Sequence, residues 1–411
     1  MYSLINKKYK IQNINIFHLC YMFMFLFVSC IVPYEGNFGG FDDVLVVNSV
    51  ITNENKRQEV KLTRSYHFEE EGPQDETGAQ VIVVSNESDE FIFEETEPGT
   101  YLSIQPFAAQ IGKEYSLQIT TANGNSYKSS PVQLPVSSTN VDDVYAERTI
   151  NSEGTEGVGI IVDSFDPSGN SKYYRHEFIV TFKIIAPYWS PYDAVFVSEG
   201  EQTFNIPVIL REQEEHTCYG TNKSNNIIIK STVGLNEDRL KDYNIGFIDR
   251  DNYILSYRCS VLVKQYVLSP ETFSYYETLR GLSQSSDNIF SEDQPGFLAG
   301  NIFSENNPSE NVAGFFEIST VEEKRIFFNH EDFFPGEELP PYIVGCFLFA
   351  PTTTGGLGKR ELVNLIRDGN IRFYDYNVDH IGNGGPYLIT SPPCGDCTVL
   401  GSNVIPDFWT E

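Results

Sequence analysis

Short runs of alternating apolar and polar residues, separated by polar turn-forming segments, dominate the chain. Examples are LVVNSVIT at 45–52, QVIVVS at 80–85 and EYSLQITT at 114–121. Such alternation places the apolar side chains on one face of a β-strand. Tyr and Phe, which number 24 and 30 among 411 residues, are also enriched in strands. We therefore predict a mostly β protein.

The first thirty residues differ from the rest. Three lysines are followed by an apolar run that ends just before Ser29-Cys30. This order is typical of a secretory signal, and the run is too short to span a bilayer. The FVSC stretch at 27–30 resembles a relaxed lipobox, with Phe27 where leucine is usual. We predict a signal peptide over 1–29 and lipid attachment at Cys30. The alternative is a plain signal peptide that is cut elsewhere.

The chain after the signal divides into three predicted parts. Residues 30–42 are rich in glycine and lack periodicity, which indicates a flexible tether. Residues 43–136 contain about seven strand-like runs, which fits an immunoglobulin-like or transthyretin-like β-sandwich. Asn123-Gly124 predicts a hairpin turn there, because such a pair accepts positive φ. Residues 140–411 are predicted to form a larger β-rich domain.

The larger domain is expected to contain two short helical insertions. Residues 173–185 and 253–268 read as strands. In the segment that follows them, Ser269 is a good N-cap and Pro270 a good first helical residue. The second helix is predicted in RELVNLIRDG, which Gly369 would close.

Five cysteines remain after the signal and Cys30. An oxidising compartment favours disulfides, and four of these cysteines lie near turns or strand ends. We predict two disulfides of undetermined pairing among Cys218, Cys346, Cys394 and Cys397. Cys259 lies on an apolar strand face and is predicted to be a buried free thiol. The Cys394–Cys397 motif could also be a redox or zinc site, but no helix follows it and no second close pair exists.

The most suggestive binding segment is the aromatic loop PYWSPY at 187–192. Exposed rings of Tyr188, Trp189 and Tyr192 could stack on sugars or anchor a partner. The competing interpretation, which is the commoner case, is a loop that folds its own rings onto the protein. The acidic turn Asp249–Asn252 offers oxygens to Ca²⁺ but lacks the glutamate of a calcium loop, so a structural turn is favoured. We predict no metal, no cofactor and no catalytic residue.

The formal net charge of -29 constrains the partners. Three of the 28 basic residues lie in the signal, which has no acidic residue, so the mature body is more acidic still. Such a body repels nucleic acid, which we exclude as a partner.

Several segments together resemble a known family. They are LVVNSVIT, GAQVIVVS, LVKQYVLSPETFSYYETL, VAGFFEISTVEEKRIFF and the ending CGDCTVLGSNVIPDFW. They resemble the Bacteroidota lipoproteins grouped as domain of unknown function 4249. The resemblance implies an outer-membrane or surface lipoprotein, often encoded beside TonB-dependent receptors. It implies no activity, substrate or catalytic residue.

Three functions follow as hypotheses. The first is an accessory binding lipoprotein of the outer membrane that faces the cell exterior and works with a TonB-dependent transporter in nutrient capture. The second is a structural or adhesive envelope protein. The third is an unrecognised hydrolase, which would need a carboxylate pair or a His–carboxylate pair in a pocket.

Overall fold

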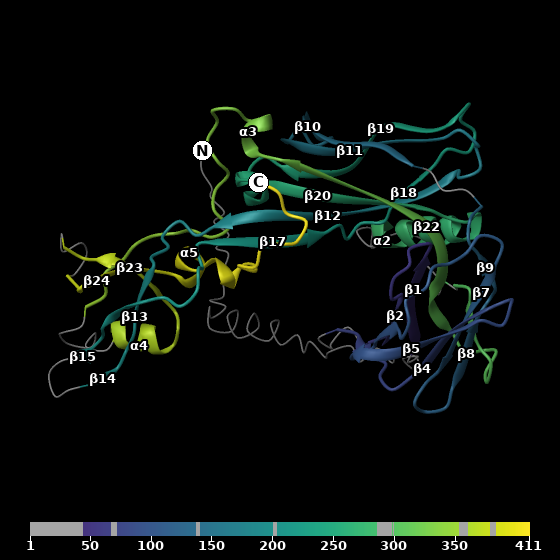
Figure 1. Cartoon of the computed structure of the whole chain (residues 1–411), viewed down its shortest axis with the longest axis horizontal. Helices are drawn as coiled ribbons and strands as arrows, with labels where there is room; N and C mark the ends of the chain where they lie inside the picture. The colour runs from purple at the N-terminus through teal and green to yellow at the C-terminus, as the bar shows by residue number, and fades with distance from the viewer. Residues whose placement is uncertain are drawn as a thin grey trace, which may run out of the picture. The chain divides into compact units, whose positions relative to one another are not determined.

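The computed structural model describes residues 44–66, 72–136, 140–199, 204–285, 298, 300–352, 361–378 and 384–411. The predicted signal peptide, the tether and Cys30 lie outside these residues. The described part is mostly β, as the alternating pattern predicted, and it combines one large mixed sheet with smaller sheets (Figure 1). Among the described residues, no helix has the length and apolar character needed to cross a membrane.

The first region consists of strands that pair mostly with their sequence neighbours. The strands are β1 (Leu45–Thr52), β2 (Glu59–Arg64), β3 (Gln74–Asp75), β4 (Gln80–Ser85), β5 (Glu90–Glu97), β6 (Thr100–Ser103), β7 (Glu114–Thr120), β8 (Ser126–Ser129) and β9 (Val132–Gln133). Alternate apolar residues of these strands meet in one core, which includes Leu62, Val83, Tyr101 and Leu117.

The predicted hairpin joins β7 to β8, with a turn that differs in detail from the expected one. Gly124 has φ +88° and donates its N–H to the carbonyl of Thr121. Asn123 keeps a negative φ, and its side-chain oxygen accepts from the backbone N–H of Asn125. Only the glycine therefore supplies the positive φ, as in a three-residue hairpin loop.

The second region adds the strands that complete the large sheet and a separate three-stranded sheet. The strands are β10 (Val141–Ile150), β11 (Glu156–Asp166), β12 (Tyr173–Ile185), β17 (Thr217–Lys223), β18 (Ile228–Ser231), β19 (Asp238–Asp249), β20 (Cys259–Val267), β21 (Ile302–Ser304) and β22 (Val312–Phe328). Strands β10, β11 and β19 form the separate sheet, and β17-β12-β20-β22 form one end of the large sheet. The apolar faces of these strands share a second core that contains Cys259, Val261 and Val263.

Strand β22 belongs to both regions. Its first half pairs in parallel with β1, and its second half pairs antiparallel with β20. Figure 1 shows it as one long strand that bends near α2 (Pro270–Ser285). Strand β21 also returns to pair with β8. Residues of β22 thus take part in pairing within both regions, and the proposed boundary near 136–140 stays a prediction.

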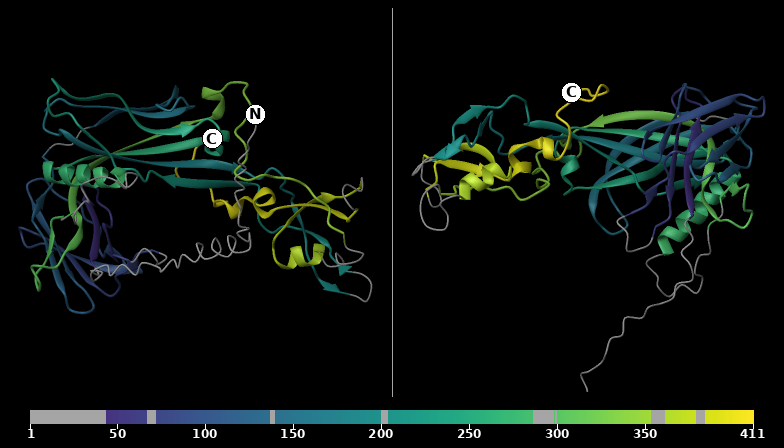
Figure 2. Two further views of the ribbon diagram at one scale, coloured as in Figure 1. Left: turned by 180° about the vertical axis from the view of Figure 1, so that it is seen from behind. Right: turned by 90° about the horizontal axis from the view of Figure 1, so that it is seen from below.

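A small lobe surrounds a third core of its own. Its elements are β13 (Tyr192–Ala194), β14 (Ser198–Glu199), β15 (Phe204–Asn205), β16 (Val208–Leu210), β23 (Arg372–Tyr376), β24 (Tyr387–Thr390) and α4 (Glu361–Arg367). Leu362, Val363, Phe373 and Ile389 are buried together there. Figure 2 shows these elements gathered at one end of the ribbon in both views.

Both predicted helical insertions are present as α2 and α4. Helix α4 ends as expected, with Gly369 at φ +68° and its N–H donated to the carbonyl of Ile366. Two further helices of four residues each, α3 (His330–Phe333) and α5 (Pro392–Gly395), were not predicted. The 3₁₀ turns η2 (Tyr253–Ser256) and η4 (Cys397–Val399) complete the elements. Turn η2 replaces the start of the strand expected at 253, because Asn252 caps it through the N–H of Ile254.

Candidate ligand groove beside helix α2

A hollow follows one side of α2. It comprises three adjoining cavities of about 850, 510 and 630 Å³, and all three are lined by Phe315. The first two also share Pro270 and Glu271, and the last two share Tyr275. Because neighbouring cavities have walls in common, we call the whole hollow the α2 groove and define it by these four residues. Its walls come from β1, β9, β12, β22, α2 and the loop between β17 and β18.

Helix α2 begins where its sequence signal predicted. The Ser269 hydroxyl accepts a hydrogen bond from the backbone N–H of Thr272 at 3.1 Å, and Pro270 follows as the first helical residue. Phe273 packs with its ring centroid 5.0 Å from that of Tyr173 on β12. These contacts hold the start of the helix against the sheet, so the side chains one turn later have fixed positions.

The first half of β22 presents opposite faces to two different environments. Phe316 and Ile318 point into the core of the first region, where both are fully buried. Phe315 and Glu317 lie on the other face, since side chains alternate along a strand. There Phe315 contacts Tyr275 and Glu317 contacts Tyr276, both from α2. One strand thus closes a core on one side and forms the groove on the other.

A buried charged network forms the floor of the groove. The Arg175 guanidinium on β12 lies 3.1 Å from the carboxylate of Glu317 and also pairs with Glu177. The Oε1 atom of Glu317 that faces Arg175 also accepts from the hydroxyl of Ser319 at 2.7 Å, and Oε2 accepts from the hydroxyl of Tyr276 at 2.7 Å. Each oxygen of this buried carboxylate therefore has a donor, which holds Glu317 in place, although Nε of Arg175 has no hydrogen-bond partner among the described residues.

Burial and the neighbouring charges determine the protonation states of Arg175 and Tyr276 in this network. Burial by itself would lower the pKa of Arg175, but the neighbouring groups, with Glu317 first among them, together outweigh burial and hold the pKa well above its usual value. Burial, and then the charge of Glu317, raise the pKa of Tyr276, so its hydroxyl stays protonated and donates. The guanidinium carbon also lies 4.0 Å from the ring centroid of Tyr266, a cation–π contact. Arg175 therefore stays charged and Tyr276 stays protonated over the physiological pH range.

Two half-buried rings form the middle of the groove. The ring centroids of Tyr275 and Phe315 are 4.8 Å apart and their planes differ by 32°. Phe315 lines every cavity of the groove, and Tyr275 lines two of them. A ligand that lies along the groove must therefore contact flat apolar surface.

The side chain of His176 is buried in the interior and takes no part in the charged network. Its neighbour Arg175 faces α2, and the His176 ring lies 5.5 Å from the ring of Tyr243 on β19. Its Nε2 shares a 2.9 Å hydrogen bond with the side-chain oxygen of Gln265. Burial lowers the pKa of His176 to about 4, so the imidazole is neutral at physiological pH.

The arrangement is suited to binding. Both carboxylates at the floor are engaged by Arg175, so neither is positioned as a free general base. Within the described residues, no group of three or more His, Cys, Asp or Glu side chains could hold a metal ion. The groove thus combines preformed apolar and polar surface with a rigid floor, which are the usual properties of a ligand site.

Sequence reasoning missed this groove. A signal was present, because Arg175 and Glu177 stand two residues apart in an otherwise apolar strand and so share one face. Glu317 likewise interrupts the apolar run GFFEIST. A buried charge needs a partner of opposite sign, and this pairing could have been proposed. The contribution of α2 could not, because nothing local to the helix indicates which strand it packs against.

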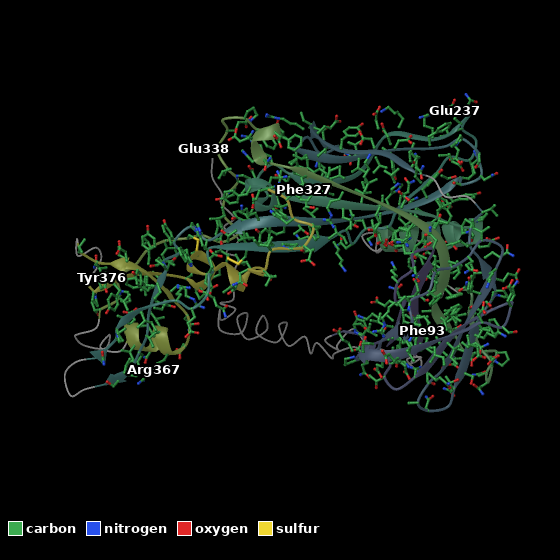
Figure 3. The ribbon with its side chains drawn as sticks, in the orientation of Figure 1. Phe93, Glu237, Phe327, Glu338, Arg367 and Tyr376 are labelled. Carbon is green, nitrogen blue, oxygen red and sulfur yellow. A yellow bond between two sulfur atoms is a disulfide. The ribbon has the colours of Figure 1, made fainter. Side chains whose placement is uncertain are left out.

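The four predicted cysteines form two disulfides. Cys218 bonds to Cys397, and Cys346 bonds to Cys394 (Figure 3). Cys259 is buried with a free thiol, as predicted, and burial raises its pKa. The two cysteines of the C-terminal motif are thus each joined to a distant cysteine, which gives them a structural role rather than the redox or zinc role considered above.

The C-terminal motif connects the lobe to the large sheet. The carbonyl of Cys394 accepts from the backbone N–H of Tyr188, and the backbone N–H of Cys397 donates to the carbonyl of Glu215. Between the two cysteines, Asp396 accepts from Arg372 at 2.9 Å and from Thr398. Burial would raise the pKa of Asp396, but these hydrogen bonds outweigh it and lower the pKa.

Of the three residues of the predicted aromatic platform, two pack against other rings of the protein and the third is exposed. Trp189 is half-buried, stacks on His216 with ring centroids 5.1 Å apart and packs against the second core. Tyr188 lies edge-on to Tyr374 at 5.4 Å. Tyr192 is 47% exposed and pairs with Leu210 across β13 and β16. Their role as a platform stays a prediction.

The turn at Asp249–Asn252 has structural partners. Arg250 pairs with Glu156 and Glu337, which connects the turn to β11 and to the segment after α3. The side chain of Asp249 accepts from the N–H of Asp251 at 2.8 Å.

Comparison with known proteins identifies the family. The model of a family described as Domain of unknown function (DUF4249) matches residues 31–325. The chain belongs to the DUF4249 family. This confirms the resemblance seen in the sequence. The DUF4249 match contains every residue that defines the α2 groove, whereas Cys346, Cys394 and Cys397 lie beyond it.

The comparisons with curated proteins and with solved structures support no further conclusion about this chain. No curated protein matches the sequence. A DUF4785 family protein from Legionella pneumophila matches in structure with 7% identity and a TM-score of 0.18, over 53% of this chain and 51% of that chain. The chain thus spans about half of that protein, and so low a score supports no conclusion.

Proposed function

We propose that this protein is a lipid-anchored binding protein of the outer membrane that holds a ligand in the α2 groove and passes it to a TonB-dependent transporter. The observation that carries the proposal is the groove itself. It is a preformed hollow with half-buried rings in the middle and a buried, hydrogen-bonded ion pair below. Such a site can bind without rearranging, which keeps the entropic cost of binding low.

The membrane attachment rests on the sequence. The signal at 1–29 and the lipobox-like stretch that ends at Cys30 support a lipid anchor, and acyl chains contribute about 0.8 kcal/mol for each buried CH₂. The family resemblance supports the outer membrane and a transporter partner. Exposure on the outer surface of the cell is part of the same proposal.

The lobe offers a surface for a protein partner. It exposes large apolar side chains, among them Leu210 at 65%, Phe347 at 65% and Val378 at 77%. Apolar groups that stay exposed on a secreted body are typical of protein-binding surfaces. This supports contact with the transporter, and it equally suits the structural or adhesive role that is the second candidate.

The finer fold assignment is also a proposal. We infer that residues 43–136 form an immunoglobulin-like or transthyretin-like sandwich. The mainly antiparallel neighbour pairing and the single shared core support it. A crystal structure of the mature protein would test it, since two packed sheets must then be visible in this region.

Affinity purification of the native lipidated protein from outer membranes tests the function. We expect a TonB-dependent receptor to be recovered, and Cys30→Ala to abolish both lipidation and this recovery. Protease treatment of intact cells should degrade the wild-type protein if it faces outward. Failure to recover any outer-membrane receptor, with the lipid present by mass spectrometry, would refute the transporter role.

A further inference from the structure

We propose that the α2 groove binds a neutral oligosaccharide. This inference rests on the proposed binding function and names the class of its ligand. It is carried by three properties of the described groove residues, which are the charge of the lining, the flat rings and the exposed amides.

The charges of the lining disfavour an anionic ligand. Two cations line the groove, and each already faces a buried carboxylate. Arg175 pairs with Glu317 at 3.1 Å, and Lys172 lies 4.0 Å from Asp238. The carboxylates of Glu114, Glu177 and Glu271 also line the groove. An acidic ligand would meet uncompensated negative charge, whereas a neutral ligand would not.

The rings provide a surface that suits a pyranose. One face of a pyranose ring carries mainly C–H groups, and these pack against a flat aromatic side chain. Tyr275 and Phe315 lie 4.8 Å apart in the middle of the groove and are tilted by only 32°. Rings this close and this nearly parallel pack on each other, so the outer face of the pair is the flat apolar surface that a sugar ring can cover.

Exposed amides flank this platform. Asn48 on β1 and Asn225 and Asn226 after β17 line the cavity on one side of Phe315, and Asn170 lines the cavity on the other. A side-chain amide can donate and accept at once, which matches the adjacent hydroxyls of a sugar. Amides on both sides of the rings suit a ligand that extends over several sugar units.

Isothermal titration calorimetry on the intact mature lipoprotein in detergent tests the proposal. The probes are maltohexaose, cellohexaose, xylohexaose, mannohexaose and laminarihexaose, with hexagalacturonate, hexaglycine and hexalysine for comparison. We expect at least one neutral hexasaccharide to bind, with an affinity that is unchanged between about 50 mM and 500 mM NaCl, because screening does not affect a neutral ligand.

Matched variants connect the binding to the groove. Phe315→Leu and Tyr275→Leu keep apolar bulk but remove the flat ring, and each should weaken binding by about tenfold or more. Tyr275→Phe keeps the ring and should bind as the wild type does. Phe303→Leu, at a side chain on β21 that is 48% exposed and lines no part of the groove, should also leave binding unchanged.

Each other outcome overturns the inference. If no neutral hexasaccharide binds, or if hexaglycine, hexalysine or hexagalacturonate binds more tightly, the ligand class is wrong. If Phe315→Leu binds a hexasaccharide as well as Phe303→Leu does, the site is wrong. The proposed function fails separately, because a protein that binds maltohexaose but recovers no receptor from membranes loses only the transporter role.

Discussion

The guanidinium of Arg175 on β12 lies 3.1 Å from the carboxylate of Glu317 on β22, and the two side chains are only 7% and 1% exposed. They stand 142 residues apart in the sequence. The pair connects β22, which closes the first core, to β12 of the second region. It lies at the floor of the α2 groove. A buried ion pair of this kind depends strongly on the presence of both partners.

Removal of one partner should therefore destabilise the protein more than removal of both. Arg175→Met leaves the buried Glu317 without an opposite charge, and Glu317→Leu leaves the buried Arg175 with only the more exposed Glu177 as a partner. Each should lower the free energy of unfolding by about 3–5 kcal/mol. The double variant should lose less than either single variant. Urea unfolding of all three variants measures this. The exposed pair of Arg239 and Glu237 is the control, with an expected loss below about 1 kcal/mol for Arg239→Met. Equal losses at Arg175 and Arg239 would contradict the argument.

Stability should fall as the pH is lowered from 6.5 to about 4. His176 has its pKa lowered from 6.5 to about 4 by burial, so in this window the unfolded chain binds a proton that the folded chain does not. The stabilisation is complete above pH 6.5 and decreases by about 3 kcal/mol by pH 4. Denaturant unfolding at a series of pH values measures it.

The matched variant for this pH effect is His176→Phe. It should show a smaller loss of stability across the same window, because no imidazole remains to titrate. His216→Gln, at a half-buried position, should keep the full decrease. A wild-type curve that is flat from pH 6.5 to 4 would exclude the role of His176.

The two disulfides should differ in their contribution to stability. The Cys218–Cys397 bond joins residues 179 positions apart, and the Cys346–Cys394 bond joins residues 48 apart. Loop entropy predicts about 5 and about 4 kcal/mol respectively. Thermal unfolding of the double Cys→Ser variants compares them. We expect the Cys218→Ser/Cys397→Ser protein to unfold at the lower temperature, and the reverse order would show that loop length does not govern the difference.

Gly314 should tolerate no side chain. Its φ is +104°, and a Cβ atom built there would lie 1.8 Å from the carbonyl oxygen of Val47 on the paired strand β1. Gly314→Ala should therefore cost about 2–4 kcal/mol, since backbone strain and a steric clash combine. Gly281→Ala, where an added Cβ meets nothing within 4 Å in helix α2, is the control and should be neutral or slightly stabilising. Urea unfolding compares the two, and equal stabilities would contradict the clash.

Local features of the sequence predicted much of the fold. The N-cap at Ser269, the glycine that ends α4 and the strand at 173–185 all depend on neighbours within a few residues, and all are present. The hairpin at Gly124 was predicted for the same reason. The 3₁₀ turn that begins at Tyr253 was missed, because an apolar run of that length also fits a strand.

The amino-acid sequence by itself determined the β-rich class, the bounds of several strands and helices, the family and the set of cysteines that form disulfides. These properties follow from side-chain periodicity, from backbone preferences and from motifs that are read within short windows. Only the tertiary structure decided the cysteine pairing, the parallel pairing of β1 with β22 and the α2 groove. Each of these joins residues far apart in the chain, and the choice among possible partners depends on which packing buries apolar surface while every buried charge keeps a partner.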